Sequence, residues 1–262
     1  MERGARFLPP YVSTRWTARL LTILLLLTAA ISGLSAGFEI SQIQYFAGTG
    51  SDAEINEETR WAHTFIRNAL LASRMALYGT IALAFIAWLH RSRINVRAFG
   101  CRRFRYSRTW AIIGFFIPIL NFFRPYQVVS EVWRASDPRA VETPVAWIAM
   151  PVSRYVAAWW VTLLASLLLE ILAAGLVTQS GATIGNLFAA RSVGVLAGIT
   201  SAASAVLAYL VVSGIEESQE EKWAIIRQAE AEADPDWTGQ QLEPEPPAIT
   251  ARSIWRAHTA ES

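Results

Sequence analysis

Four stretches of the chain are apolar over about the length that a helix needs to cross a bilayer. They cover residues 20–38, 69–89, 155–177 and 192–214, and polar segments separate them. About 20 apolar residues, at about 1.5 Å each, cross about 30 Å of hydrocarbon, and only helices or closed barrels satisfy their backbone groups there. The pattern therefore predicts an all-α protein, a transmembrane helical bundle of four spans.

A shorter apolar run lies between the second and third predicted spans. It covers residues 110–123 and is interrupted by Gly114, Pro118 and Asn121. A crossing there would carry Arg124 and the charged residues after it to the outer side. Broken backbone at membrane depth is tolerated where protein or water covers it. We therefore expect a cytoplasmic re-entrant or interfacial hairpin, and a fifth span is the alternative.

The segment after the hairpin has the pattern of a short amphipathic helix. Residues 125–135 place Pro125 in a first turn, where a missing backbone donor does no harm, and they bring Val128, Val129 and Val132 onto one face. We expect this helix to bury its valine face against the spans.

The polar C-terminal part of the chain divides into two segments. Residues 216–233 are rich in Glu, Ala and Gln and predict a helix that continues the fourth span and ends at Asp234 and Pro235. The remainder is rich in proline and poor in apolar residues, which predicts disorder. Trp237 and Trp255 in this segment are candidate docking points for a protein partner.

The chain is predicted to have three domains. Residues 1–19 form a cytoplasmic N-terminal segment, and residues 216–262 form a cytoplasmic tail. Residues 20–215 form the membrane domain, which includes the arginine-rich loop 90–154.

Arginine is distributed asymmetrically, and this asymmetry predicts the orientation in the membrane. Four arginines precede the first span and eleven lie between the second and third, whereas the predicted loop 39–68 carries mostly carboxylates. Short loops rich in basic residues stay on the cytoplasmic side, so we expect both termini to be cytoplasmic. The first apolar stretch is longer than the core of a signal peptide, about 7–15 residues, and we expect it to remain as an uncleaved span.

Composition narrows the functional classes. Apolar residues make up 53% and charged residues 17% of the 262 residues, with a mean hydropathy of +0.30. Cys101 is the only cysteine, and His63, His90 and His258 show no metal-ligand spacing, so we expect no disulfide, metal or cofactor. The chain has no phosphate-binding loop, nucleophile motif or nucleic-acid-binding module. We therefore expect neither an enzyme nor a nucleic-acid-binding protein.

The cytoplasmic loop carries the candidate ligand-binding residues. Arginines just beyond a span bind anionic headgroups at about 1 kcal/mol each, and nearby asparagine and tyrosine side chains add hydrogen bonds. The candidate site consists of Arg91, Arg93, Asn95, Arg97, Asn121, Arg124 and Tyr126. We expect this face, rich in arginine and asparagine, to engage anionic lipid or a protein partner. The alternative is that the arginines only hold the loop on the cytoplasmic side.

Two opposite charges lie inside the predicted spans. Arg74 and Glu170 are each about 15 residues from the cytoplasmic ends of their spans, which places both about 20–24 Å above those ends. An unpaired charge in the membrane costs a few kcal/mol or more, so we expect an intramembrane ion pair, with Arg191 as the alternative partner of Glu170. A small transporter or channel that uses this pair and the hairpin is the alternative function.

Small residues recur in the fourth span at a spacing of three or four. They are Gly194, Gly198, Ser201, Ala202 and Ala205. Such residues let helices approach closely. Packing within the chain is the first interpretation, and oligomerisation through this face is the second.

Several motifs between residues 88 and 138 together resemble a known family. They read Trp-x-x-Arg-x-Arg-x-Asn-x-Arg-Ala-x-Gly from Trp88, then Arg-Pro-Tyr-Gln from Arg124, then Glu-x-Trp-Arg-Ala-Ser-Asp-Pro from Glu131, followed by the pair Trp159-Trp160. In combination they resemble the bacterial DUF4328 membrane family over roughly residues 69–214. The resemblance implies a multi-pass protein of the bacterial cytoplasmic membrane with an uncharacterised role and no assigned catalytic residues. The acidic tail falls outside it.

Overall fold

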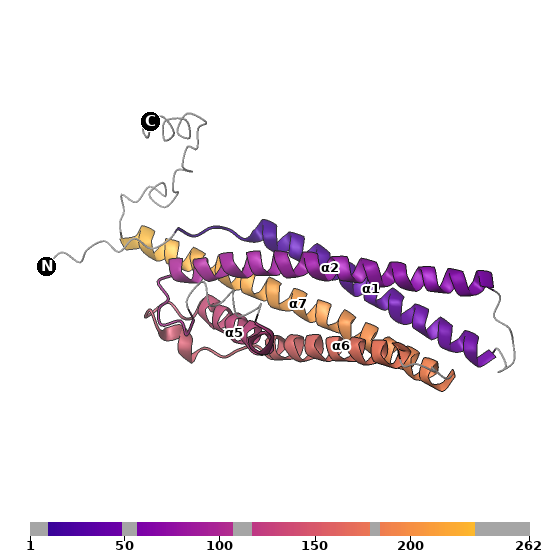
Figure 1. Ribbon diagram of the computed structural model, residues 1–262. Coiled ribbons are helices and arrows are strands. Elements are labelled where there is room, and N and C mark those ends of the chain that lie inside the picture. The colour runs from indigo at the N-terminus through magenta and orange to yellow at the C-terminus, as the bar shows by residue number, and fades with distance from the viewer. Residues whose placement is uncertain (1–9, 49–56, 107–116, 179–183, 234–262) are drawn as a thin grey trace, which may run out of the picture.

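The computed structural model describes residues 10–48, 57–106, 117–178 and 184–233. Its four long helices are α1 (Arg15–Gly48), α2 (Glu57–Ala98), α6 (Arg154–Thr178) and α7 (Ile184–Ala233). They run lengthwise along one another in alternating directions (Figure 1). Each is long and apolar enough to cross a membrane, which confirms the prediction of an all-α protein with four candidate spans.

Helices α1 and α7 form the centre of the bundle. The most extensive packing joins α7 to α6 and α7 to α1, and α2 packs against α1. A Cβ atom added to Gly198 of α7 would lie 2.9 Å from the Ala36 Cβ and 2.9 Å from the Ser32 carbonyl oxygen. The small-residue face of the fourth span is therefore used, at Gly198, for close packing on α1 within the chain.

Large apolar side chains cover the outside of the bundle. Leu83 on α2 and Val161, Leu168 and Ile171 on α6 are 64–71% exposed. An apolar surface of this kind is unfavourable in water, whereas in hydrocarbon it is matched by lipid chains and the helices satisfy their own backbone groups. The outward-facing composition of α2 and α6 is that of a multi-pass membrane protein.

The helices are longer than the apolar stretches that predicted them. α1 continues to Gly48, and α2 begins at Glu57 and continues to Ala98. The expectation of a loop over residues 39–68 is therefore wrong for most of that segment. A helix that leaves the hydrocarbon still satisfies its backbone groups internally, and Glu, Gln and Ala favour helix.

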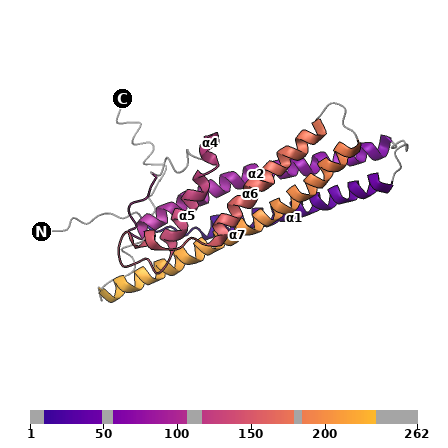
Figure 2. The ribbon, with the colours of Figure 1, turned by 90° about the horizontal axis from the view of Figure 1, so that it is seen from below.

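The connection between α2 and α6 folds at one end of the bundle, which we call the α5 end (Figure 2). It contains α4 (Pro118–Asn121), α5 (Arg124–Ser136) and a 3-10 helix (Ala146–Ala149). α2 ends where Gly100 adopts a φ of 77°. The Gly100 amide donates to the Arg97 carbonyl at 3.0 Å and the Cys101 amide to the Val96 carbonyl at 3.2 Å, an arrangement that terminates helices and favours glycine.

Helix α5 confirms the amphipathic helix predicted after the hairpin. Pro125 lies in its first turn, and Val128, Val129 and Val132 are completely buried. These valines belong to the same core cluster as Trp88 of α2, which is also completely buried. Apolar residues of the connection are therefore part of the buried core of the bundle.

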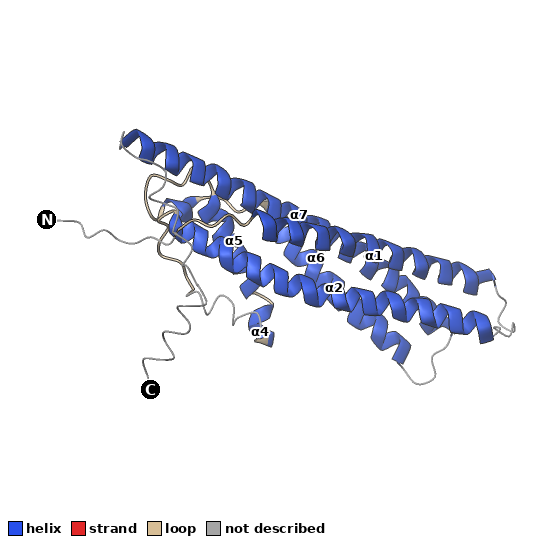
Figure 3. Cartoon of the chain, turned by 90° about the horizontal axis from the view of Figure 1, so that it is seen from above, coloured by secondary structure: helices blue, strands red, loops and turns tan. Residues whose placement is uncertain are grey.

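Two of the predicted segments are described only in part. α4 projects from the bundle (Figure 3) and is a short helix between the second and third candidate spans. Residues 110–116 of the predicted hairpin lie outside the described residues, so its depth in the membrane stays a prediction. α7 continues to Ala233, which confirms the helical extension of the fourth span. Residues 234–262, predicted to be disordered, also lie outside the described residues.

Candidate functional site

Asn95, one of the predicted ligand-binding residues, lies in the interior of the α5 end. It is completely buried, and its side chain accepts a hydrogen bond from the Val12 amide at 3.1 Å. Its Nδ2 donates to the Val12 carbonyl at 2.9 Å and to Gln219 Oε1 at 3.1 Å. Asn95 therefore fastens the segment before α1 to α2 and α7, and its hydrogen-bonding capacity is used inside the protein.

Two residues of α7 that the sequence analysis did not select complete this buried network. Gln219 Nε2 donates to the Ser92 carbonyl at 3.0 Å and to Ser136 Oγ at 3.1 Å. Lys222 is completely buried, and its Nζ donates to the carbonyls of Ala135 and Ala140 at 2.9 and 2.8 Å. A buried ammonium needs such partners, and here they lie at and beyond the C-terminal end of α5, where a cation is favourable.

Arg93 is also held by intramolecular partners. Its Nη1 donates to Glu131 Oε2 at 3.2 Å and its Nη2 to the Tyr106 carbonyl. Glu131 also accepts from the Arg105 amide at 3.0 Å. α5 turns this carboxylate toward the buried Arg93 of α2, so Glu131 links α5 to α2.

The other five predicted residues lie on α2, α4 and α5. Arg91 is exposed, and Asn121 is exposed at the end of α4. The guanidinium carbons of Arg97 and Arg124 lie 5.7 and 3.8 Å from the ring centroids of Phe104 and Tyr106 respectively. Tyr126 packs against the apolar core. The seven residues are thus spread over three helices, and Arg93, Asn95, Arg97, Arg124 and Tyr126 contact other residues at the α5 end.

The structure brings Arg74 and Glu170 together across the bundle. Arg74 Nη2 donates to Glu170 Oε1 and, at 3.1 Å, to the hydroxyl of Tyr78. The Tyr78 hydroxyl lies 2.7 Å from Ser201 Oγ, which lies 3.0 Å from Ser32 Oγ. We call these five residues the polar layer. They connect all four long helices at one level of the bundle.

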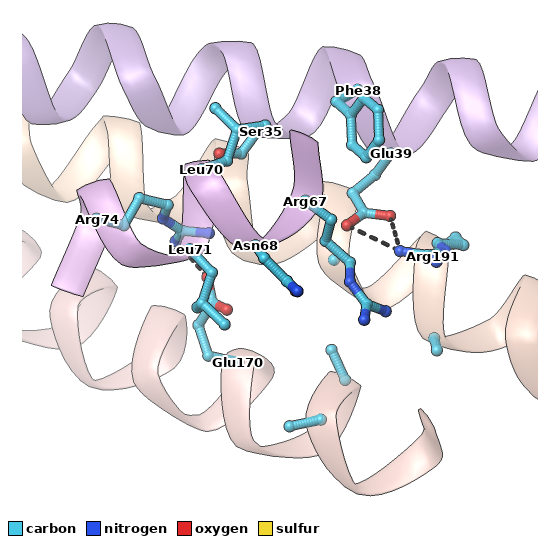
Figure 4. A pocket seen from close by; sticks show the side chains of 14 residues that line it. Ser35, Phe38, Glu39, Arg67, Asn68, Leu70, Leu71, Arg74, Glu170 and Arg191 are labelled. Atoms are coloured by element: carbon cyan, nitrogen blue, oxygen red, sulfur yellow. Dashed lines mark hydrogen bonds and ion pairs between the residues drawn. The ribbon is translucent and has the colours of Figure 1, made fainter. Parts of the chain in front are cut away.

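On the side of the polar layer away from α5 there is a cavity of about 360 Å³ between α2 and α6, with α1 and α7 at its back. Figure 4 shows Arg67 and Asn68 of α2 pointing into this space, with Glu39 and Arg191 beside it. We call it the polar cavity. Its lining residues are Ser35, Phe38, Glu39, Arg67, Asn68, Leu70, Leu71, Arg74, Glu170, Ala173, Ala174, Ala190, Arg191 and Gly194.

The charges of the polar cavity are only partly matched by the described residues. Arg191 Nη1 donates to Glu39 Oε2 at 2.9 Å and to Oε1 at 3.3 Å, so Glu39, not Glu170, is the partner of Arg191. Within the described part of the chain, Arg67 has no carboxylate partner. The buried Nε atoms of Arg74 and Arg191 have no acceptor there either. Arg67 and Asn68 therefore present donors and a positive charge to the cavity, which an anionic group would satisfy.

On the α5 side of the polar layer there is a second cavity, of about 370 Å³, between the same two helices. Tyr78, Ser201 and Asn121 are among its few polar lining residues, and Asn121 comes from α4. We call it the apolar cavity. Its apolar lining residues include Leu25, Ile81, Phe85, Phe122, Trp159, Trp160, Leu163 and Leu167. Both cavities have volumes in the range of small-molecule sites, about 300–1,000 Å³.

Glu39, Arg67 and Asn68 lie in the segment 39–68, for which the sequence predicts a loop, so none of them is among the predicted site residues. A signal was present, since Arg67 and Arg74 are seven residues apart and so lie on one face of a helix. The described residues contain no group of three or more His, Cys, Asp or Glu side chains arranged to hold a metal ion.

Comparison with known proteins gives one match. A family model described as a domain of unknown function, DUF4328, matches residues 51–217. The matched region contains α2, α4, α5, α6 and most of α7, and it leaves out α1 and with it Glu39. No curated protein and no solved structure matches the chain.

Proposed function

The chain belongs to the DUF4328 family, and from that premise we propose that it is a non-enzymatic membrane protein that binds an anionic lipid between α2 and α6. In this proposal the polar cavity takes the headgroup and the apolar cavity takes a hydrocarbon chain. The family description assigns no function, so the proposal rests on the geometry of these two cavities.

The observation that carries the proposal is the contrast between two neighbouring cavities. Arg74 and Tyr78, one helical turn apart on α2, line the polar and the apolar cavity respectively. A lipid has the same division between a charged head and an apolar chain. Three arginines face two carboxylates at the polar end, so an anionic headgroup complements the cavity.

A transporter or channel, the alternative expected from the sequence, needs a continuous polar path from Glu170 to Asn121. Asn121 does line the second cavity, but large apolar side chains such as Phe85, Trp159 and Leu163 line most of the space between. This lining suits a hydrocarbon chain better than an ion or a water-filled path. These features favour lipid binding over transport.

We propose the following orientation in the bacterial inner membrane. The α5 end, with its exposed arginines, faces the cytoplasm, and the polar cavity lies in the outer leaflet. Ile119, Phe122 and Phe123 are 55–76% exposed around α4, and Trp160 Nε1 donates to the Phe122 carbonyl at 2.9 Å. An apolar, exposed α4, anchored to α6 through the residue that follows it, supports an interfacial or re-entrant hairpin.

Native mass spectrometry of the detergent-purified protein tests the site. The protein is stripped of lipid and then offered phosphatidylglycerol. We expect Arg67→Gln to lower lipid occupancy about fivefold, the effect of about one arginine at a bilayer surface. Arg91→Gln removes an equal charge from the exposed surface of the α5 end, and we expect it to retain the wild-type occupancy.

Two results would overturn this site. Equal lipid occupancy in the wild type and Arg67→Gln would show that the polar cavity does not bind the headgroup. Loss of lipid from Arg91→Gln alone would move the site to the arginine-rich face at the α5 end. Thermal unfolding of each variant is measured in parallel, so that a loss of binding is not confused with a loss of fold.

A further inference from the structure

We infer that the polar cavity selects a headgroup that carries a single negative charge, a phosphodiester, over zwitterionic headgroups and over phosphomonoesters with two charges. This inference rests on the proposed function and specifies its ligand. It follows from the number of charged side chains in the cavity and from the way they are paired.

The formal charge of the lining is plus one. Its three guanidinium groups belong to Arg67, Arg74 and Arg191, and its two carboxylates belong to Glu39 and Glu170, so three minus two leaves one positive charge. A site removed from bulk water favours a ligand that cancels its charge, because an uncompensated charge is costly there. One negative charge on the ligand makes the occupied cavity neutral.

The pairing of these residues locates the uncompensated charge. Glu39 is paired with Arg191, and Glu170 with Arg74. The Arg191 and Glu39 side chains are only 13% and 18% exposed, so this pair is held within the protein. Arg67 is the remaining cation, and its guanidinium points into the cavity beside Asn68 (Figure 4). An anion in the cavity would therefore pair with Arg67.

The geometry of the donors fits the two free oxygens of a phosphodiester. Guanidinium groups bind such oxygens with two parallel hydrogen bonds, and Arg67 is free to do so. The amide of Asn68, which also points into the cavity, supplies a further donor. A phosphomonoester adds a second negative charge close to Glu39 and Glu170, and a zwitterionic headgroup adds an ammonium close to three guanidinium groups. Both additions are repulsive.

A competition experiment measures the selectivity. The delipidated protein is offered equal amounts of phosphatidylglycerol, phosphatidylethanolamine and phosphatidic acid with identical acyl chains, at pH 8, where a phosphomonoester with a second pKa of about 6 is doubly charged. Native mass spectrometry then reads the occupancy of each lipid. We expect phosphatidylglycerol to exceed each competitor about fivefold, the effect of about one unit charge near a bilayer surface.

Variants of the cavity test whether its net charge sets this preference. Arg67→Gln lowers the formal charge of the lining to zero and is expected to abolish the preference for phosphatidylglycerol over phosphatidylethanolamine. Glu39→Gln raises it to plus two and is expected to shift the preference toward phosphatidic acid. The double variant Arg67→Gln/Glu39→Gln returns the lining to plus one, and we expect it to regain the preference for phosphatidylglycerol. Arg19→Gln, an exposed position on α1, is the control and keeps the wild-type pattern.

The possible results separate this inference from the proposed function. Binding of all three lipids without preference, but lost in Arg67→Gln, would overturn the charge selectivity and leave lipid binding in place. Absence of any bound lipid would overturn both. A double variant that regains no preference for phosphatidylglycerol would also overturn the inference, because the net charge of the lining would not then decide the choice.

Discussion

Arg74 shows how this protein accommodates a charged side chain inside an apolar span. The Arg74 side chain is 9% exposed, and the side chain of its partner Glu170 is 31% exposed. The guanidinium also donates to the Tyr78 hydroxyl. Removing one partner of such a pair leaves the other charge uncompensated, and this costs more than the pair itself contributes.

A double-mutant cycle measures the coupling of this pair. We expect Arg74→Gln and Glu170→Gln each to lower the free energy of unfolding by about 1–3 kcal/mol. The double variant should lose less than the sum of the two, because neither charge then remains alone. Unfolding in detergent, followed by tryptophan fluorescence, gives the three values. Additive losses would show that the two side chains do not interact.

Lys222 illustrates a buried charge that joins two segments of the fold. Its ammonium holds the carbonyls of Ala135 and Ala140. We expect Lys222→Met to destabilise the protein by about 1–3 kcal/mol, the cost of leaving a buried polar group unsatisfied. The neighbouring exposed residue provides a control, since Glu221→Gln should leave the unfolding temperature unchanged. Equal unfolding temperatures for the two variants would contradict this role of Lys222.

Cys101 should react slowly in the folded protein. Burial raises the pKa of its thiol, although the nearby Lys222 ammonium opposes the shift. The thiolate is the reactive form, so a raised pKa and a buried position both lower the rate of alkylation. At pH 8 we expect labelling by a maleimide to be slow, to increase as the pH approaches the raised pKa, and to become fast on unfolding. Intact-mass measurements over time follow this, and labelling at the rate of a free thiol would refute it.

At the level of the helices, the close approach of α1 and α7 constrains the bundle. It depends on Gly198, where an added Cβ would come within 3 Å of α1. By contrast, a Cβ added to Gly79 on α2 would meet nothing within 4 Å. A larger side chain is therefore tolerated at Gly79 but not at Gly198.

Alanine substitutions at these two positions form a matched pair. We expect Gly198→Ala to destabilise the protein by about 1–3 kcal/mol, as overpacking of a tight contact does. Gly79→Ala should be neutral or slightly stabilising, because alanine favours helix more than glycine does. Thermal unfolding in the same detergent compares them. If both are tolerated equally, the contact between α1 and α7 is looser than described.

The sequence predicts the helices better than it predicts their contacts. Apolar stretches of membrane-spanning length specify four spans, and the valine spacing in α5 specifies its buried face, because both patterns are local. The partners of Arg93, Glu131 and Asn95 lie between 26 and 124 residues away along the chain, apart from a shorter contact of Arg93 with Tyr106. Periodicity carries no information about such distant partners, so the sequence does not predict which of these residues bond within the protein.

Among the charged residues that line the polar cavity, the sequence predicts an ion pair only for Arg74 and Glu170, which both lie in predicted spans. The depths of Arg74 and Glu170 suggested an ion pair because each could be counted along its own helix. Glu39 and Arg67 lie where α1 and α2 continue beyond the predicted hydrocarbon. Helix boundaries are the least certain part of a prediction from sequence, and these residues were therefore assigned to a loop.

For the whole molecule, the orientation in the membrane can be tested by cysteine labelling of intact cells. In a Cys101→Ser background, Glu142→Cys places a thiol on the exposed surface at the α5 end, and Thr64→Cys places one on exposed α2 near the polar cavity. We expect a membrane-impermeant maleimide to label Thr64→Cys in intact spheroplasts and Glu142→Cys only after permeabilisation. The reverse pattern would invert the proposed topology and move the polar cavity to the cytoplasmic leaflet.

The length of α7 has a mechanical consequence. Its 50 residues make a rod of about 75 Å, whereas the hydrocarbon layer is about 30 Å thick. Arg191 lies near one end of this rod and Lys222 toward the other. If the rod tilts by about 5° around its midpoint, each end moves by about 3 Å. A movement of the Arg191 end of α7 would then move the Lys222 end, on the other side of the hydrocarbon layer, because both belong to one continuous helix.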